Sequence, residues 1–225
     1  MRLKKVLIVI LTLSMCNINK INAQLSLGAQ GTFGAFTGGV GLLKGFGIEG
    51  GYGLLHGRKG NTGSKLFLCG SFNYYGGGKG SGSFDANALS SLNPLQSITV
   101  PYTWTLHMLQ FNIGAKYYVA GNMDAPFSFY TQLGLTIEDM PVVYNVSSYD
   151  QTSYDNSQAP TNSNNVGIAF HLGLGIDVKA GPVHPYLATR LIIPANTVNG
   201  QSIDIVIPFA AVVDLGVRIP IGGDK

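Results

Sequence analysis

The chain has 225 residues, of which 45% are hydrophobic and 11% are charged, and its formal net charge is +3. Its length and even composition, with no linker and no second compositional block, favour a single domain. After Ala23 no apolar run reaches the length of a membrane-spanning helix, which excludes further transmembrane helices.

The first 23 residues have the three parts of a secretory signal peptide. Three basic residues precede an apolar run from Val6 to Leu13, and the small residue Ala23 closes the segment. The apolar run is too short for a membrane anchor, which takes about 20 residues. We therefore expect cleavage after Ala23 and a mature domain of residues 24–225.

An alternative interpretation takes the segment Leu13-Ser-Met-Cys16 as a lipoprotein cleavage site, with Cys16 acylated. Met15 fits this pattern poorly, since a glycine or alanine is wanted before the cysteine. Cleavage after Ala23 would instead remove Cys16 and leave Cys69 as the remaining cysteine, so no intramolecular disulfide is expected.

Cleavage also changes the charge of the protein. It removes four of the 14 basic residues and none of the 11 acidic ones, so the formal net charge falls from +3 to −1. The mature chain therefore gives no electrostatic reason to expect nucleic-acid binding.

Eight segments of the mature chain alternate apolar residues with polar or small ones, at the period of two that is typical of β-strands. Each segment is close to the length of about 9–11 residues that crosses a bilayer as a tilted strand. In chain order they are Leu25–Phe36, Gly45–Leu55, Lys65–Tyr75, Tyr102–Val119, Phe127–Glu138, Val166–Lys179, Val183–Ile193 and Ile203–Ile221.

The alternation is inverted relative to that of a soluble barrel. Between Val166 and Lys179 one face carries valine, isoleucine, phenylalanine and leucine, and the other carries glycine, alanine, histidine, aspartate and lysine. The second face cannot form an apolar core, so the first must face lipid. The sequence therefore predicts an all-β fold, an eight-stranded antiparallel up-and-down transmembrane β-barrel.

The fourth segment contains a change of phase. Trp104, Leu106 and Met108 are apolar at even positions, whereas the apolar positions from Leu109 onward are odd. We expect a β-bulge near Met108 to account for the change.

The connections between the segments alternate in length. Those at about 56–64, 120–126 and 180–182 are short, and those at about 76–97 and 139–164 are the longest. Outer-membrane barrels keep short turns in the periplasm and long loops outside, so we expect the two long connections at the cell surface. The first contains a glycine-rich stretch, Gly76–Ser83, which lacks the ending of a phosphate-binding loop and is expected to be flexible.

Aromatic residues near the ends of the segments are expected to form girdles at the two membrane surfaces. Aromatic side chains are common in β-proteins, but their position at strand ends favours this interpretation. They are Tyr74, Tyr75, Tyr102, Trp104, Tyr117, Tyr118, Phe127, Phe129 and Tyr144.

Three stretches of strand sequence resemble the small outer membrane protein β-barrel family of Gram-negative bacteria, whose architecture is that of the OmpA transmembrane domain. They are Phe46-Gly-Ile-Glu-Gly-Gly-Tyr52, Leu109-Gln-Phe-Asn-Ile-Gly-Ala-Lys-Tyr-Tyr118 and Leu172-Gly-Leu-Gly-Ile-Asp177. The resemblance implies a location in the bacterial outer membrane. Many such barrels end on an aromatic residue, whereas this chain ends in Gly-Gly-Asp-Lys225.

The inward positions collect charged residues of both signs in nearly equal number. An eight-stranded barrel has just enough room for its own side chains, and buried charges are retained when they are paired. We therefore expect a polar charge network that plugs the barrel interior. Its predicted members are Glu49, Lys116, Glu138, His171, Asp177, Arg190, Asp214 and Arg218.

These observations favour a non-enzymatic outer-membrane barrel with a structural, surface-interaction or accessory-subunit role. The expected partners are outer-membrane lipid and lipopolysaccharide, with a larger outer-membrane protein complex as a further candidate. No nucleic acid, cofactor or metal is expected. A narrow channel for small solutes or ligands is the alternative, because many inward residues are glycine.

A lipid-modifying barrel enzyme is the third alternative. Some eight-stranded barrels act on the acyl chains of lipopolysaccharide with a histidine, a serine and an acid near the outer rim. The chain has four histidines, His56, His107, His171 and His184, and none has the adjacent serine pattern of those enzymes. By position His107 is the candidate.

Overall fold

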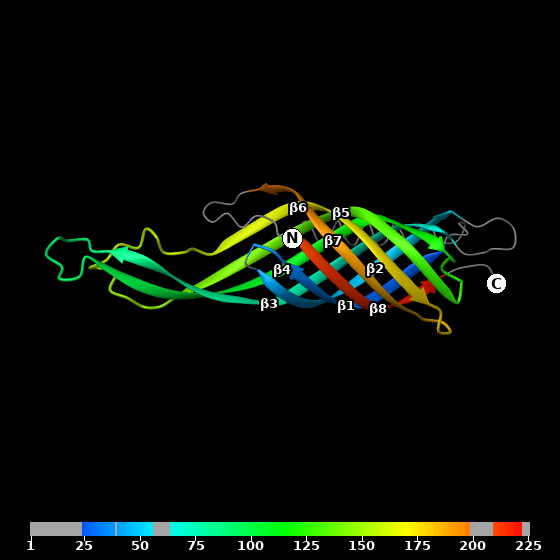
Figure 1. The fold of residues 1–225 in the computed structure, drawn as a ribbon, viewed down its shortest axis with the longest axis horizontal. Coiled ribbons are helices and arrows are strands. Elements are labelled where there is room, and N and C mark those ends of the chain that lie inside the picture. Colours follow the sequence, from blue (N-terminus) through cyan, green and yellow to red (C-terminus); the bar gives the residue numbers. More distant parts are fainter. Residues whose placement is uncertain (1–23, 39, 56–63, 199–208, 222–225) are drawn as a thin grey trace, which may run out of the picture.

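The computed structural model of the chain describes residues 24–38, 40–55, 64–198 and 209–221. Eight antiparallel strands form a closed barrel, in which each strand pairs with its chain neighbours and the last pairs with the first (Figure 1). The expected fold class is therefore confirmed. The strands are β1 (Leu25–Phe36), β2 (Gly41–Leu55), β3 (Leu66–Asn87), β4 (Ser97–Ala120), β5 (Phe127–Val146), β6 (Ser163–Val178), β7 (His184–Val198) and β8 (Ala210–Ile221).

Two predictions fall on residues outside these ranges. The predicted signal peptide spans residues 1–23, and the eighth predicted segment begins at Ile203, ahead of the first described residue of that strand. Among the described residues, no helix is long and apolar enough to cross a membrane.

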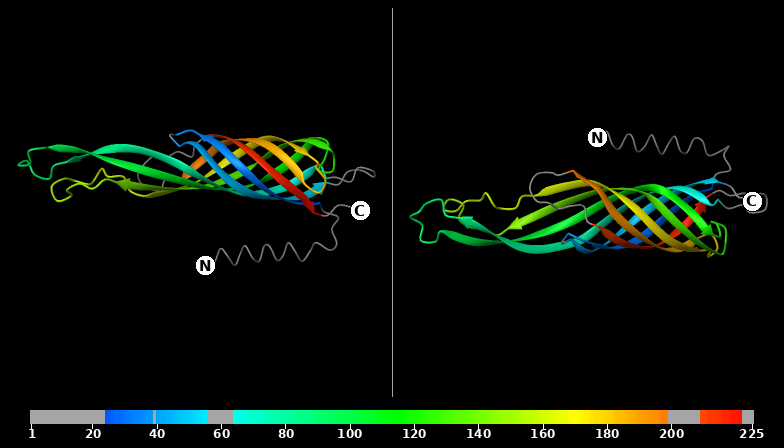
Figure 2. Two further views of the ribbon diagram at one scale, coloured as in Figure 1. Left: turned by 90° about the horizontal axis from the view of Figure 1, so that it is seen from below. Right: turned by 45° about the horizontal axis from the view of Figure 1, so that its top comes forward.

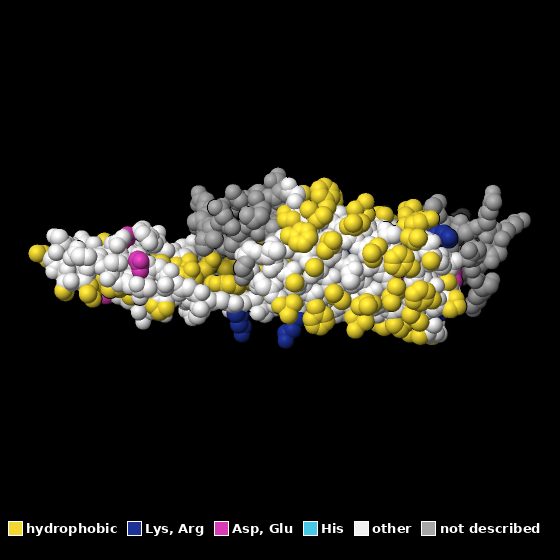
Figure 3. Space-filling model, viewed as in Figure 1, with side chains coloured by type: hydrophobic (Ala, Val, Ile, Leu, Met, Phe, Trp, Pro, Cys, Tyr) yellow, Lys and Arg dark blue, Asp and Glu magenta, His cyan; other side chains and the backbone are white. Residues whose placement is uncertain are grey.

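The outer wall of the barrel is apolar and its interior is polar. On β6, the side chains of Phe170 and Leu172 are about half exposed, whereas the intervening His171 is 5% exposed. The same alternation continues around the ring, and hydrophobic side chains cover the barrel wall in Figure 3. The inverted pattern of the sequence therefore describes the real orientation of the strands, with the apolar face outward.

The strands have unequal lengths, and this gives the molecule its shape. β3, β4 and β5 contain 22, 24 and 20 residues, whereas β1 and β8 contain 12 each. The three long strands continue past the rim as a protruding sheet at one end of the barrel (Figure 2). We call this sheet, which is formed by residues 77–87, 97–106 and 142–146, the protrusion.

The protrusion corrects the predicted extent of the two long connections. Residues 76–87 and 97–101 belong to β3 and β4, and residues 139–146 belong to β5, so the connections shorten to 88–96 and 147–162. Both lie at the end of the barrel opposite the start of β1 and the end of β8 (Figure 1). The predicted alternation of short and long connections is thus correct, although their bounds are not.

The glycine-rich stretch is a paired strand, and its prediction as a flexible loop is wrong. It pairs with β4 from Gly78, opposite Leu106, onward through Gly80 and Gly82. Aromatic rings from β4 fill the space above these glycines, because a Cβ at Gly80 would overlap the Trp104 ring and one at Gly82 would lie 2.6 Å from the Tyr102 ring. Cross-strand aromatic packing of this kind stabilises glycine in a sheet.

The expected bulge near Met108 of β4 is also wrong, since β4 keeps one phase along its length. Leu106 and Met108 point inward like Gln110 and are almost fully buried. The irregularity lies in the neighbouring strand β3, between Tyr75 and Gly78. There Gly77 has a φ of 94°, in the left-handed region that favours glycine.

The aromatic girdles are only partly as predicted. Tyr117 and Phe127 face outward with about half of their surface exposed, as expected of residues that meet the headgroup region. Tyr75 and Tyr118 are fully buried inside the barrel instead. Their hydroxyl groups find partners there, which allows a tyrosine to be buried. Trp104, as described above, packs over Gly80 in the protrusion.

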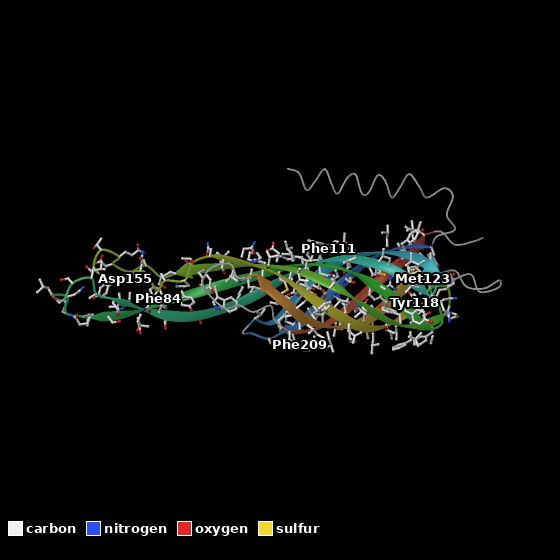
Figure 4. All side chains as sticks on the ribbon, turned by 90° about the horizontal axis from the view of Figure 1, so that it is seen from above. Phe84, Phe111, Tyr118, Met123, Asp155 and Phe209 are labelled. Carbon is white, nitrogen blue, oxygen red and sulfur yellow. The ribbon has the colours of Figure 1, made fainter. Side chains whose placement is uncertain are left out.

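The segment 147–162 folds back over one face of the protrusion and forms a small core outside the barrel. Phe84 and Val100 are buried there, and the ring of Tyr149 meets that of Phe84 edge-on at 5.9 Å. The backbone N–H of Asp155 donates to the carbonyl of Asn87 at 2.8 Å. Figure 4 shows Phe84 and Asp155 together at the protruding end. This core holds the segment against the strands.

Candidate functional site

The barrel interior is the candidate functional site, because it holds the buried acidic and basic residues of the described chain: Lys116, Glu138, Asp177, Arg190, Asp214 and Arg218. It consists of three layers between the protruding end and the opposite end. The layer at the opposite end contains Phe67, Tyr118, Met123, Tyr130, Tyr186 and Ala188. The middle layer holds ion pairs. The layer nearest the protrusion is apolar, with Phe36, Val40, Leu43, Tyr75, Leu106, Met108, Met140, Val142, Ala169, Ile192, Ala210 and Val212.

Arg218 of β8 is the centre of the first ion-pair cluster. Its Nη1 donates to both carboxylate oxygens of Asp177, at 2.7 and 2.8 Å, and its Nε donates to Glu49. Lys116 lies 3.7 Å from the other oxygen of Glu49, and the hydroxyl of Tyr118 donates to Asp177 at 2.5 Å. Strands β2, β4, β6 and β8 are thereby joined across the interior, with Arg218 completely buried.

Arg190 of β7 and Asp214 of β8 form the second cluster. The guanidinium donates from Nε at 2.7 Å and from Nη2 at 3.1 Å, which is a bidentate arrangement. Gln30 extends the cluster, because its amide donates to Asn73 at 2.7 Å and accepts a hydrogen bond from the Tyr186 hydroxyl. These contacts connect β7 and β8 to β1 and β3.

Aromatic rings of the layer at the opposite end pack against two of the cations. The guanidinium carbon of Arg218 lies 4.2 Å from the centre of the Tyr186 ring, and Lys116 Nζ lies 4.7 Å from that of Tyr130. Such cation–π contacts stabilise charges that have left water. The interior therefore offers Arg218 and Lys116 both a carboxylate and a ring.

Glu138 and His171 face the interior as predicted, but neither joins an ion pair in the described part of the chain. Glu138 accepts a hydrogen bond from Gln110 at 2.7 Å, and its other carboxylate oxygen is buried with no partner there. His171 Nδ1 lies 3.0 Å from the hydroxyl of Thr136. Both residues belong to a hydrogen-bonded region beside the two clusters.

A cavity of about 30 Å³ lies between the layers, with Glu49, His171 and Arg190 among its lining residues. This volume is enough for one or two water molecules. The inward glycines do not enlarge it, because neighbouring side chains fill the space above them. A Cβ at Gly173 would lie 2.8 Å from Gln132. Among the described residues, the interior is therefore packed around this cavity.

The histidines show no catalytic arrangement within the described ranges. His107 lies on the outer wall, where Nδ1 is 2.7 Å from the Tyr74 hydroxyl and the two rings stack. His184 is buried, and among the described residues neither of its ring nitrogens has a hydrogen-bond partner. His56 lies outside the described residues. No group of three or more His, Cys, Asp or Glu side chains in these ranges is arranged to hold a metal ion.

The described chain forms a closed ring of eight antiparallel strands with an apolar outer wall and a charged interior. This is the fold of a small outer-membrane β-barrel. The resemblance seen in the sequence and the outer-membrane location that it implies agree with this architecture.

Solved structures of the same architecture share little sequence with the chain. Neisserial surface protein A is 13% identical, with 88% of this chain and 97% of that chain covered and a TM-score of 0.46. The N-terminal β-barrel domain of OprF from Pseudomonas aeruginosa is 12% identical, with 87% and 97% covered and a TM-score of 0.47. The outer membrane enzyme PagL is 14% identical, with 87% and 99% covered and a TM-score of 0.38. No protein-family model and no curated protein sequence matches the chain.

The likeness extends to the fold alone. A fold by itself does not determine the role of a protein. Its function has to be argued from its own interior and surface.

Sequence reasoning missed the apolar layer and the uncharged partners of the ion pairs. Leu106 and Met108 were assigned to the wrong face because the interior was expected to be polar throughout. Gln30, Tyr118 and Tyr186 each contact a charged residue or its partner, and each stands at an inward position of the predicted alternation. These inward positions in the predicted alternation were the signal that could have identified the three residues as partners of the ion pairs.

Proposed function

We propose that this protein is a non-enzymatic outer-membrane barrel with a closed interior, whose role is structural, surface-interacting or that of an accessory subunit. The observation that supports this proposal is the continuous filling of the interior by side chains. A pore needs a path of water along the barrel axis, whereas the cavity between the packed layers has room for one or two waters.

The apolar layer is the first barrier to a solute. The side chains of Leu43, Leu106, Met108, Met140 and Ile192 come from four different strands, and each is at most 1% exposed. Protein interiors are close-packed, so a solute would have to displace several of these side chains together. The layer therefore blocks polar and charged solutes.

The ion-pair layer is the second barrier. Each carboxylate of the two clusters has a buried cationic partner, and removing one partner of a buried pair costs about 3–5 kcal/mol. A solute that separated the pairs would have to supply this energy from its own contacts. The predicted charge network, formed around Arg218 and Arg190, is therefore proposed to act as the second barrier to solutes.

Outer-membrane lipid and lipopolysaccharide are the proposed partners of the outer wall. Lys44 of β2 is exposed between two strongly exposed apolar residues, Leu42 and Phe46, near the end of the barrel that carries the protrusion. A lysine in this position extends its ammonium toward the headgroup level. We assign it to the phosphorylated headgroup of lipopolysaccharide.

Conductance in planar bilayers tests the closed interior. The purified mature protein is expected to give no discrete openings over a wide voltage range. Openings that disappear in the Gly173→Phe variant would contradict the proposal and support the narrow channel. Migration on gels with and without heating confirms that each sample is folded.

Two further measurements test the remaining parts. Incubation of the protein with lipopolysaccharide is expected to leave the mass of the lipopolysaccharide unchanged. A loss of acyl chains that requires His107 would contradict the non-enzymatic role. A pull-down in mild detergent tests the accessory-subunit role. If no stoichiometric partner is recovered, that role loses its support and the structural or surface-interacting role remains.

A further inference from the structure

One edge of β3 is open along the protrusion. β2 pairs with β3 only as far as Gly76, whereas β4 pairs with its other side as far as Asn87. Between Gly77 and Ala86, this edge has no partner strand among the described residues. An unpaired edge presents a row of backbone donors and acceptors, which is a template for an additional strand.

The hydrogen bonds at the tip show which residues point their backbone groups to the open edge. The N–H of Leu89 and the carbonyl of Asn87 bond to segment 153–155 on the open side, whereas the N–H of Ala88 bonds to Gln96 on the other side. Backbone groups alternate in direction along a strand, and the register with β4 is unbroken from Gly78 to Asn87. Odd-numbered residues therefore face the open edge.

The open groups belong to four residues that form one face of the protrusion: Lys79, Ser81, Ser83 and Asp85. Their N–H and carbonyl groups give four donors and four acceptors. The chain itself already uses the end of this edge, because Ala88 and Tyr154 form an antiparallel bridge. The edge is therefore able to accept an antiparallel strand.

The two faces beside the open edge differ in chemistry. On one face the rings of Trp104 and Tyr102 lie over Gly80 and Gly82, and both rings remain partly exposed. These rings form a shelf where an added strand would place apolar side chains. The other face carries serines between the exposed side chains of Lys79 and Asp85.

The charges on this face are opposite in sign and unpaired. In the described ranges neither Lys79 nor Asp85 forms an ion pair, and Asp85 accepts a hydrogen bond from the hydroxyl of Thr99 at 2.8 Å. An added antiparallel strand would satisfy both charges with a basic residue near its start, opposite Asp85, and an acidic residue near its end, opposite Lys79.

From these observations we infer that the edge of β3 between Lys79 and Asp85 binds an extended peptide segment of a partner protein by antiparallel strand addition. The segment alternates apolar residues, which contact Trp104 and Tyr102, with polar ones, and it carries a basic start and an acidic end. Backbone hydrogen bonds supply affinity and the alternate side chains supply specificity.

A second copy of the chain does not fit this edge as well as a peptide segment does. Two copies in the same membrane would point their β3 strands in the same direction, so they would meet in parallel. The antiparallel bridge at Ala88 and the positions of the two charges both favour an antiparallel partner. The inference rests on the proposed function only in placing the protrusion outside the cell.

Binding of a designed probe tests the inference. The probe is the fluorescein-labelled peptide Lys-Val-Thr-Val-Thr-Val-Glu, added to the full mature protein in detergent and followed by fluorescence anisotropy. Saturable binding is expected. Ser81→Pro removes one open-edge N–H and adds a ring there, while β4 keeps its own bonds, so affinity is expected to fall at least about tenfold.

Matched variants separate this effect from unfolding. Ser81→Ala keeps the N–H and is expected to bind like the wild type, and Ser83→Pro is expected to repeat the loss. Heat-dependent gel migration shows whether each variant is folded. Folded proline variants that bind the probe as well as the wild type would overturn the inference.

Exchange of the charges tests the register. The reversed probe Glu-Val-Thr-Val-Thr-Val-Lys is expected to bind the wild type several-fold more weakly, and the Lys79→Glu, Asp85→Lys double variant is expected to prefer it. Equal binding of both probes to both proteins would contradict the register. A dimer in light scattering that is lost in Ser81→Pro would identify a second copy as the occupant and overturn the peptide.

These outcomes do not depend on the closed interior. A barrel that conducts ions but binds the probe would refute the proposed function and leave this inference intact. A barrel that conducts no ions and fails to bind the probe would leave the proposed function intact and refute this inference.

Discussion

Replacement of Arg218 by methionine tests the ion-pair layer directly. Methionine has a similar length but no charge, so Arg218→Met removes three hydrogen bonds to Asp177 and Glu49. Lys116 remains 3.7 Å from Glu49, but Asp177 keeps only the Tyr118 hydroxyl among its side-chain partners here. A buried carboxylate that has lost its partner costs about 3–5 kcal/mol, so we expect the free energy of unfolding to fall by this amount.

Urea titration in lipid vesicles measures this free energy, followed by the fluorescence of the single tryptophan. The double variant with Arg218→Met and Asp177→Asn is expected to recover most of the loss, because Glu49 still pairs with Lys116 and no carboxylate is left without a cation. Lys179→Met, at the exposed end of β6, is a control expected to stay within about 0.5 kcal/mol of the wild type.

One result would refute the reasoning. If Arg218→Met unfolds at the same urea concentration as the wild type, water must solvate the orphaned carboxylates. The interior would then be hydrated, and the closed-barrel proposal would lose the second of its two barriers.

Three further predictions concern single sites. Gly134→Val would force a Cβ into a carbonyl group of the neighbouring strand, so we expect it to lower the free energy of unfolding by about 1–3 kcal/mol or more. Gly50→Ala should have much less effect in the same urea titration, because its Cβ would have no atom nearer than 3.8 Å. Gly80→Val would displace the Trp104 ring and shift its fluorescence emission to longer wavelength; an unchanged spectrum would contradict the packing of the ring over the glycine. The hydroxyl and N–H of the threonine two residues later hold the pKa of the exposed Asp150 at about 2, below its ordinary value. The stabilisation of this turn is therefore present above about pH 4 and lost as the pH falls to about 2. The measurement is the hydrogen exchange of that N–H relative to its intrinsic rate at each pH, and this protection should fall over the range.

The faces of the strands were predictable from the sequence because the membrane imposes a strict period of two. The segment Leu25–Phe36 was predicted with the same bounds that β1 has. On β8, Asp214 and Arg218 face inward and the intervening apolar residues face outward, as expected. Lipid on one side and a polar interior on the other allow no other orientation for these segments.

The ends of β3 and β5 were not predictable in the same way. Beyond Tyr75 the strand leaves the membrane, so its outer face no longer has to be apolar and the period of two loses its signal. Glycine disfavours strands by propensity, and the rings that compensate come from Trp104 and Tyr102 on another strand. Only the register between β3 and β4 brings these residues together.

Pairing inside the barrel was only partly predictable. The sequence indicated that Glu138 and Arg190 face the interior, but the period of two gives the face of a residue and not its height along the axis. Arg190 therefore meets Asp214 on the adjacent strand, whereas Glu138 meets Gln110. Heights depend on the stagger between neighbouring strands, which a single sequence does not reveal.

The bulge at Gly76 and Gly77 has a consequence for how this protein can vary. Below the bulge the odd residues of β3 face the interior, and above it the even residues do, so the extra residue sets which side chains of the protrusion face its small core. Deleting one of these two glycines would turn Phe84 out into water and Lys79 toward the core. Insertions or deletions in pairs above the bulge would preserve both faces. The protrusion can therefore change its length in steps of two residues without altering the barrel below it.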